Sequence, residues 1–336
     1  MSDERESADL FLLAPTWKGR VGAFLRFLAF VALFFVFTVV LLLILGWLLI
    51  PDWPRDPMAN LGRLLPLQVT AEVLGALAAT ALMARAGGRR LGDFGFHGSH
   101  RARNFLVGLA SGLGLLALLL LALRLGSAMA VEGTSRAPAT AMLDAALYAV
   151  MMLGIGYAEE SFSRGYALAA LSQSLSFWPA AVATGVVFGL MHAANGGETP
   201  MGLASAALFG IVLAYSYRRT GSLWFAIGLH AGWDYAESFV FGVPNSGITL
   251  PGYLLHARFD GPAWLTGGSA GPEGSVLILV VFAAMVLIIR KLSRRAPRDR
   301  ALRQAQEAAA VASSRERPHR ATTVVDGRDM PGQARP

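Results

Sequence analysis

The sequence of 336 residues contains no cysteine. This absence excludes a disulfide framework, a thiolate metal site and a cysteine nucleophile. Charged residues are also scarce, at 15% against the roughly 25% typical of a soluble domain, while 54% of the residues are hydrophobic. The composition therefore predicts a protein that lies in a lipid bilayer rather than in water.

The formal net charge of +7 does not indicate a nucleic-acid partner. The basic residues stand at the ends of apolar runs and in the last segment, where they set membrane orientation. We therefore expect the bilayer itself as a partner and no nucleic acid. The sequence does not indicate an oligomeric state.

Long apolar runs follow one another along the chain, most of them near the roughly 20 residues that cross a bilayer. They predict an all-α, polytopic helical bundle of about eight transmembrane helices. The runs are 21–50, 65–84, 104–125, 141–172, 178–195, 201–217, 221–241 and 273–292.

Arginine gathers in alternate connections, at 85–103, 218–219 and 290–300. Because basic loops stay in the cytoplasm, this pattern predicts a multi-pass protein of the plasma membrane with both termini cytoplasmic. The predicted organisation has five parts: a cytoplasmic N-terminal segment 1–20, transmembrane helices within 21–139 with a surface-lying cytoplasmic connector 85–103, a core 140–241, an outer loop and last helix 242–292, and a disordered basic cytoplasmic tail 293–336.

Ionisable residues inside membrane helices are costly and need a reason, and this sequence concentrates them in one stretch. Glu160 and Arg164 are four positions apart, so they share a helix face and can form an ion pair. Glu159 then points about 100° away. This carboxylate is free to face a cavity, where it could act as a general base.

Two further patterns follow on later helices. Phe188 and His192 have i,i+4 spacing, as do His230 and Asp234, with Glu237 on the same stripe. Each imidazole alone is more often an interhelical hydrogen-bond donor than a catalyst. One carboxylate and two imidazoles from three separate helices, however, favour a functional site.

The order Glu-Glu-x-x-x-Arg, Phe-x-x-x-His, His-x-x-x-Asp resembles the CPBP intramembrane proteases, which include CAAX prenyl endopeptidases and bacteriocin-processing or immunity proteins. The motifs here are Glu159-Glu160-Ser161-Phe162-Ser163-Arg164, Phe188 to His192, and His230 to Asp234. The resemblance covers residues 140–241 and implies an endopeptidase that acts on membrane-protein or lipidated-peptide substrates.

Carried over by motif, the resemblance implies that Glu159 is the general base and that His192 helps to hold the water. It implies that His230 and Asp234 stabilise the tetrahedral intermediate, with Glu160, Arg164 and Phe188 in support. The sequence departs from the family in two places. Ser163 replaces a frequent bulky aromatic residue, and Asp234 replaces an asparagine. Because an ionised aspartate can only accept hydrogen bonds, Asp234 must be protonated or act by orienting His230.

Glu159, His192 and His230 are also a ligand set that zinc could take. The sequence has no His-Glu-x-x-His helix, and a zinc-bound Glu159 would leave the paired Glu160 as the base. We therefore favour a metal-free mechanism without a cofactor and keep zinc as the alternative.

Two other functions stay open at this stage. One is a non-catalytic membrane partner, such as an immunity factor or scaffold. The other is a proton-coupled transporter, although the sequence shows no pair of Gly/Pro-broken helices in matching halves.

Overall fold

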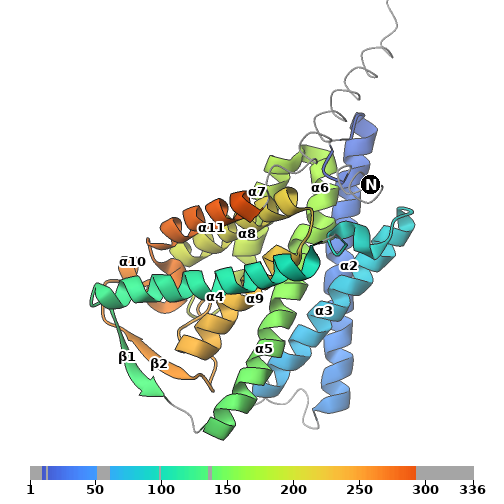
Figure 1. The fold of residues 1–336 in the computed structure, drawn as a ribbon. Helices are drawn as coiled ribbons and strands as arrows, with labels where there is room; N and C mark the ends of the chain where they lie inside the picture. Colours follow the sequence, from blue (N-terminus) through green and yellow to red (C-terminus); the bar gives the residue numbers. More distant parts are fainter. Residues whose placement is uncertain (1–9, 13, 51–60, 98–99, 135–137, 293–336) are drawn as a thin grey trace, which may run out of the picture.

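The protein is predominantly helical, and Figure 1 shows the fold of the computed structural model. The structure describes residues 10–12, 14–50, 61–97, 100–134 and 138–292. The elements of the first half are α2 (Trp17–Leu49), α3 (Leu61–Ala86), η1 (Leu91–Phe94), α4 (Arg101–Leu125), β1 (Met129–Thr134), α5 (Pro138–Glu160), η2 (Ser161–Tyr166) and α6 (Ala167–Leu175). Those of the second half are α7 (Phe177–Met191), η3 (His192–Ala194), α8 (Pro200–Thr220), α9 (Trp224–Tyr235), η4 (Ala236–Phe241), β2 (Leu255–Phe259), α10 (Ala263–Thr266), η5 (Gly268–Ala270), η6 (Pro272–Gly274) and α11 (Ile278–Leu292).

Within the described residues, six helices are long and apolar enough to cross a membrane. They cover 17–49, 64–86, 101–125, 140–175, 177–194 and 200–220. The chain is thus a polytopic helical membrane protein, as predicted, with fewer full-length spans than the expected eight. The two remaining apolar runs are not among these six: they form α9, which continues directly into η4, and α11, of 15 residues.

The prediction of an all-α protein is wrong in one place. β1 and β2 form a two-stranded antiparallel sheet, with Met129 opposite Phe259. At the surface of this sheet, Glu132 Oε1 accepts a hydrogen bond from Arg258 Nε at 2.8 Å, and Glu132 Oε2 lies 3.0 Å from His256 Nδ1. The sequence does not predict these strands, because each is short and its partner is far away in the sequence. No local pattern of residues indicates that the two segments pair.

The described residues of the connector 85–103 turn their aromatic side chains toward the protein interior. That this connector lies on the membrane surface stays a prediction. Phe94 and Phe96 are buried. Gly95 turns the chain at a φ of 100°, which glycine adopts without strain. Its carbonyl accepts from Leu223 N at 2.9 Å, and the Phe96 carbonyl accepts from Trp224 Nε1 at 3.0 Å. The connector therefore docks on the start of α9.

Helix α4 crosses α9 at very short range (Figure 1). A Cβ added at Gly108 or Gly112 of α4 would lie 2.3 or 2.2 Å from carbonyl oxygens of α9. Gly228 and Gly232 of α9 face α4 in the same way, at 2.2 and 2.4 Å. Small residues let membrane helices approach closely, so this contact fixes α9, the helix that carries His230 and Asp234. The predicted tail 293–336 lies outside the described residues. Residues 1–9 and 13 of the predicted segment 1–20 also lie outside them, and α2 begins at Trp17.

Candidate active site

The helix that carries the two glutamates is interrupted directly after them. α5 ends at Glu160 and continues as the π-helical turn η2, in which Gly165 leaves helical geometry with a ψ of −111°. The Ser161 and Ser163 hydroxyls donate to the carbonyl oxygens of Tyr157 and Glu159, one turn earlier. Such π-helical insertions are frequent at functional sites. Here the insertion follows the paired glutamates and precedes α6.

Glu160 is the centre of a buried ion network. Its Oε1 atom lies 2.9 Å from Arg164 Nη1 and 3.0 Å from His230 Nδ1. The Arg164 Nη1 atom also lies 2.5 Å from Ser163 Oγ, and the guanidinium stacks over the Phe188 ring at 4.2 Å from its centroid. The predicted Glu160–Arg164 pair is confirmed. The contact with His230 joins α5 to α9, which spacing along one helix could not reveal.

The other ring nitrogen of His230 faces two more carboxylates. His230 Nε2 lies 3.5 Å from Asp234 Oδ2 and 3.7 Å from Glu159 Oε2. The Glu159 side chain is 24% exposed, whereas that of Glu160 is fully buried. Glu159 is therefore the glutamate of this pair that a substrate could reach.

His192 ends α7, and its orientation is fixed by its own helix. His192 Nδ1 lies 2.8 Å from the Phe188 carbonyl oxygen. Because a carbonyl can only accept, Nδ1 carries the hydrogen. A neutral His192 ring therefore presents the lone pair of Nε2, which can accept a hydrogen bond from water.

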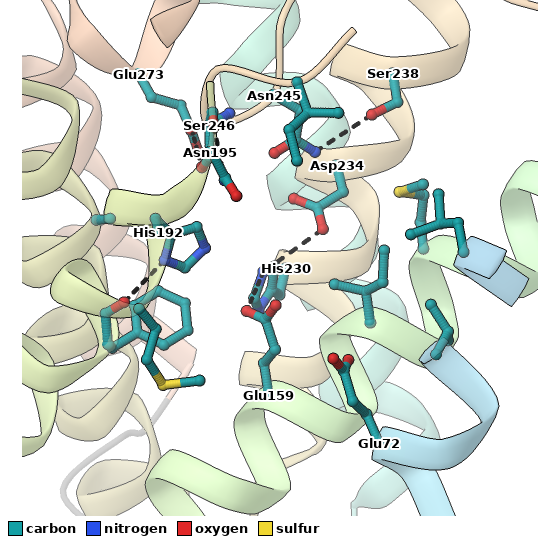
Figure 2. Close-up of a pocket in the computed structure, with 18 of the residues that line it drawn as sticks. Glu72, Glu159, His192, Asn195, His230, Asp234, Ser238, Asn245, Ser246 and Glu273 are labelled. Atoms are coloured by element: carbon teal, nitrogen blue, oxygen red, sulfur yellow. Dashed lines mark hydrogen bonds and ion pairs between the residues drawn. The ribbon is translucent and has the colours of Figure 1, made fainter. Parts of the chain in front are cut away.

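These side chains meet in one cavity of about 310 Å³ (Figure 2). Glu159, His192, His230, Asp234 and Phe188 all line it, and Glu160 and Arg164 do not. Figure 2 shows His192 on one wall and Glu159 with His230 on the facing wall. The structure thus brings the predicted catalytic residues together and keeps the Glu160–Arg164 pair behind them.

Comparison with protein families gives one match in this region. Residues 141–236 match the family described as Type II CAAX prenyl endopeptidase Rce1-like. This segment is similar to the Rce1-like family. The resemblance predicted for 140–241 is thereby confirmed, and the match supports an intramembrane endopeptidase with protein or peptide substrates in the membrane. Neither the curated proteins nor the solved structures compared with the chain yield a match.

Several cavity residues, most of them outside the Rce1-like segment, were not assigned a role from the sequence. Glu72 and Gln68 come from α3, and Gln68 Nε2 donates to Glu72 Oε1 at 2.9 Å. A carboxylate inside an apolar run was the available signal for Glu72. Glu273 carried the same signal, because it is the first residue of the apolar run 273–292. The remaining polar residues of the cavity had none: Asn195, Ser238, Asn245 and Ser246.

What we call the Glu273 clamp is formed by Glu273, Ser246, Asn195 and Trp233, of which the first three line the cavity. Glu273 Oε2 accepts from Ser246 N at 2.9 Å and Ser246 Oγ at 2.6 Å, and its Oε1 accepts from Trp233 Nε1 at 3.2 Å. Asn195 Nδ2 donates to the Ser246 carbonyl at 2.8 Å. The clamp therefore joins two positions that follow the Rce1-like segment, Ser246 and Glu273, to α9 and to the loop after His192.

The alternative zinc set was Glu159, His192 and His230. Among the residues that the structure describes, no three His, Cys, Asp or Glu side chains are grouped so that they could hold a metal ion. His192 lies across the cavity from the other two (Figure 2). The geometry thus does not support this ligand set, and the metal-free mechanism stays a prediction.

Proposed function

We propose that this protein is an intramembrane endopeptidase that hydrolyses peptide bonds of membrane-associated or lipidated proteins. The observation that carries the proposal is the shared cavity, where Glu159, His192 and His230 converge from three separate helical segments. The match to the Rce1-like family supports the same class of reaction. We place the enzyme in the plasma membrane with both termini cytoplasmic, as the arginine pattern predicts.

In this mechanism Glu159 is the general base. A water held between Glu159 and the Nε2 lone pair of His192 gives its proton to the carboxylate as its oxygen attacks the peptide carbonyl. Glu159 later passes this proton to the departing amine. General base catalysis of this kind contributes roughly 10²- to 10⁴-fold in rate.

His230 and Asp234 act on the opposite side of the reacting carbonyl. Glu160 holds His230 Nδ1 at 3.0 Å, and the Asp234 carboxylate lies 3.5 Å from Nε2. These two contacts fix the ring orientation, as a carboxylate partner does for a catalytic imidazole. In this proposal Asp234 is ionised and orients His230, since an ionised carboxylate cannot donate to an oxyanion.

A comparative peptidomic survey tests the proposal without assuming a substrate. Native host membranes that contain the wild type, Glu159→Gln or Glu132→Gln are compared at equal protein level. Glu132 is a matched control because it lies in β1, outside the cavity lining. We expect particular membrane proteins to show new cleaved ends with the wild type and Glu132→Gln, and none with Glu159→Gln.

The opposite outcome separates the competing functions. Identical profiles for all three proteins, together with a phenotype in a deletion strain, would replace the protease by a non-catalytic partner. Substrate uptake into proteoliposomes that depends on a proton gradient would instead favour a transporter.

A further inference from the structure

The proposed hydrolysis creates a negative oxygen, and the residue next to His230 is poorly suited to receive it. Asp234 lines the cavity with a side chain that is only 6% exposed. An ionised carboxylate offers no hydrogen to an oxyanion, and two negative charges at short range repel each other strongly in a site shielded from water. A neutral N–H donor is therefore needed from elsewhere on the wall.

The ring N–H groups of His192 and His230 already have hydrogen-bond acceptors within the protein. His192 Nδ1–H points to the Phe188 carbonyl, and the neutral ring leaves only a lone pair on Nε2. His230 Nδ1–H points to Glu160, and its Nε2 atom lies between Asp234 and Glu159. Any proton on Nε2 is thus drawn to two carboxylates already present.

The Glu273 clamp uses most of the other donors. Ser246 directs its backbone N–H and its hydroxyl to Glu273. Asn195 directs Nδ2 to the Ser246 carbonyl at 2.8 Å, a short and well-formed bond. These contacts hold the wall together.

Asn245 is the amide donor that lies beside Asp234 (Figure 2). It lines the cavity, and Figure 2 shows its side chain next to that of Asp234. Its Nδ2 atom donates to Ser238 Oγ at 3.3 Å, beyond the usual N–H···O range. A carboxamide carries two N–H donors, and a serine hydroxyl both donates and accepts. Either orientation of the Asn245 amide can therefore keep Ser238 as a partner.

The backbone around Asn245 holds it in place. Asn245 N donates to the Ile248 carbonyl at 2.9 Å, and Ile248 N donates back to the Asn245 carbonyl at 2.9 Å. Gly247 N is tied in turn to the Ala270 carbonyl at 3.0 Å. A donor on a fixed turn costs little reorganisation when charge develops, which is the condition for effective oxyanion stabilisation.

We propose that Asn245 is a catalytic residue, whose side-chain N–H donates to the oxyanion of the tetrahedral intermediate. The inference rests on the proposed endopeptidase function. As the water oxygen bonds to the carbonyl carbon, the π electrons of the carbonyl move to its oxygen, and Asn245 stabilises that charge. When the carbonyl re-forms, the C–N bond breaks and the amine leaves with the proton carried by Glu159. Asn245 lies outside the segment 141–236, so the family match does not contain it.

The test removes the N–H donor at position 245 and supplies a new one at position 234. Cleavage of a peptide identified in the peptidomic survey is measured in proteoliposomes with the wild type, Asn245→Ala, Asp234→Asn and the double variant. We expect Asn245→Ala to lower kcat by roughly 10²- to 10³-fold with little change in KM. The double variant should recover at least part of this loss, because an asparagine at position 234 supplies a new N–H beside the same oxygen.

A structural role for Asn245 would give a different result. Ser111→Ala is the control, since Ser111 lies in α4 outside the cavity lining and donates to the Val107 carbonyl, and it should leave kcat near the wild-type value. An unchanged kcat in Asn245→Ala, or a double variant no faster than Asn245→Ala in protein of equal thermal stability, would overturn the proposal. If instead the wild type cleaves no more than Glu159→Gln, the endopeptidase function itself fails.

Discussion

Glu160 Oε1 lies 3.0 Å from His230 Nδ1, although the two residues are 70 positions apart in the sequence. The same oxygen lies 2.9 Å from Arg164 Nη1. One fully buried carboxylate thus joins a cation in η2 to the imidazole of α9. It links the stability of the fold to the orientation of the catalytic ring.

Replacing Glu160 should affect stability first. Glu160→Gln leaves the Arg164 guanidinium buried without its charge partner, which typically costs about 3–5 kcal/mol. We expect a clear fall in Tm of the detergent-purified protein, and a much smaller change for Glu159→Gln. The combination Glu160→Leu with Arg164→Met removes both charges and should regain part of the stability. An unchanged Tm in Glu160→Gln would show that Arg164 does not depend on this pair.

The glycine contact between α4 and α9 gives a prediction on packing. A Cβ at Gly112 would lie 2.2 Å from the Leu229 carbonyl oxygen, so Gly112→Ala must push the helices apart. Overpacking of this kind costs about 1–3 kcal/mol, and displacement of α9 should also lower cleavage. Gly114→Ala is the matched control, because nothing lies within 4 Å of its added Cβ. It should be neutral or slightly stabilising. Equal Tm values for the two variants would contradict the close approach.

His192 should matter for rate and not for folding. His192→Gln keeps an N–H that can reach the Phe188 carbonyl but removes the imidazole, and we expect a loss in kcat of roughly 10²- to 10⁴-fold. His256→Gln is the control, since His256 is 48% exposed on β2 and pairs with Glu132 at the surface, where an ion pair contributes little. Measured kcat and Tm should separate the two. Comparable activities would remove His192 from the mechanism.

Glu198 lies in the loop between η3 and α8, and we expect it to make the stability of the protein depend on pH. Burial raises the pKa of Glu198 above its ordinary value of 4.5; the Thr199 backbone N–H opposes this shift and Glu273 adds to it. The folded state therefore holds this proton more tightly than the unfolded chain does. The resulting stabilisation is present below the unfolded pKa and is lost as the pH rises through the folded pKa.

The measurement compares Tm for the wild type and Glu198→Gln as the pH rises from below 4.5. Because the glutamine stays neutral, the Tm of the variant should increase relative to that of the wild type as the pH rises, until the difference in Tm becomes constant. A difference in Tm that is independent of pH would show that Glu198 does not titrate with a raised pKa.

The part of the site that could be predicted from the sequence is the part encoded by helical spacing. Glu160 with Arg164, and His230 with Asp234, are i,i+4 pairs, and both are in contact in the structure. The cost of an ionisable group in lipid made these residues conspicuous. Helix periodicity is a local property, so one sequence is enough to read it.

The rest of the site depends on contacts between distant segments. Asn245, Ser246 and Glu273 reach the cavity from turns that follow α9, and no spacing rule connects them to Glu159. Uncharged Asn245 and Ser246 also lie in a polar stretch, where they cost nothing unusual. Only the folded chain shows that they face the same space.

The small sheet and the glycine contact have a practical consequence for anyone who wishes to move this activity into another protein. Residues 141–236 look like a portable module when family likeness is the guide. Yet α4 and β1 precede them, β2 and Glu273 follow them, and each makes direct contacts with the segment or with its neighbours. Grafted alone, the module would carry its glutamates and histidines without the scaffold that aims them.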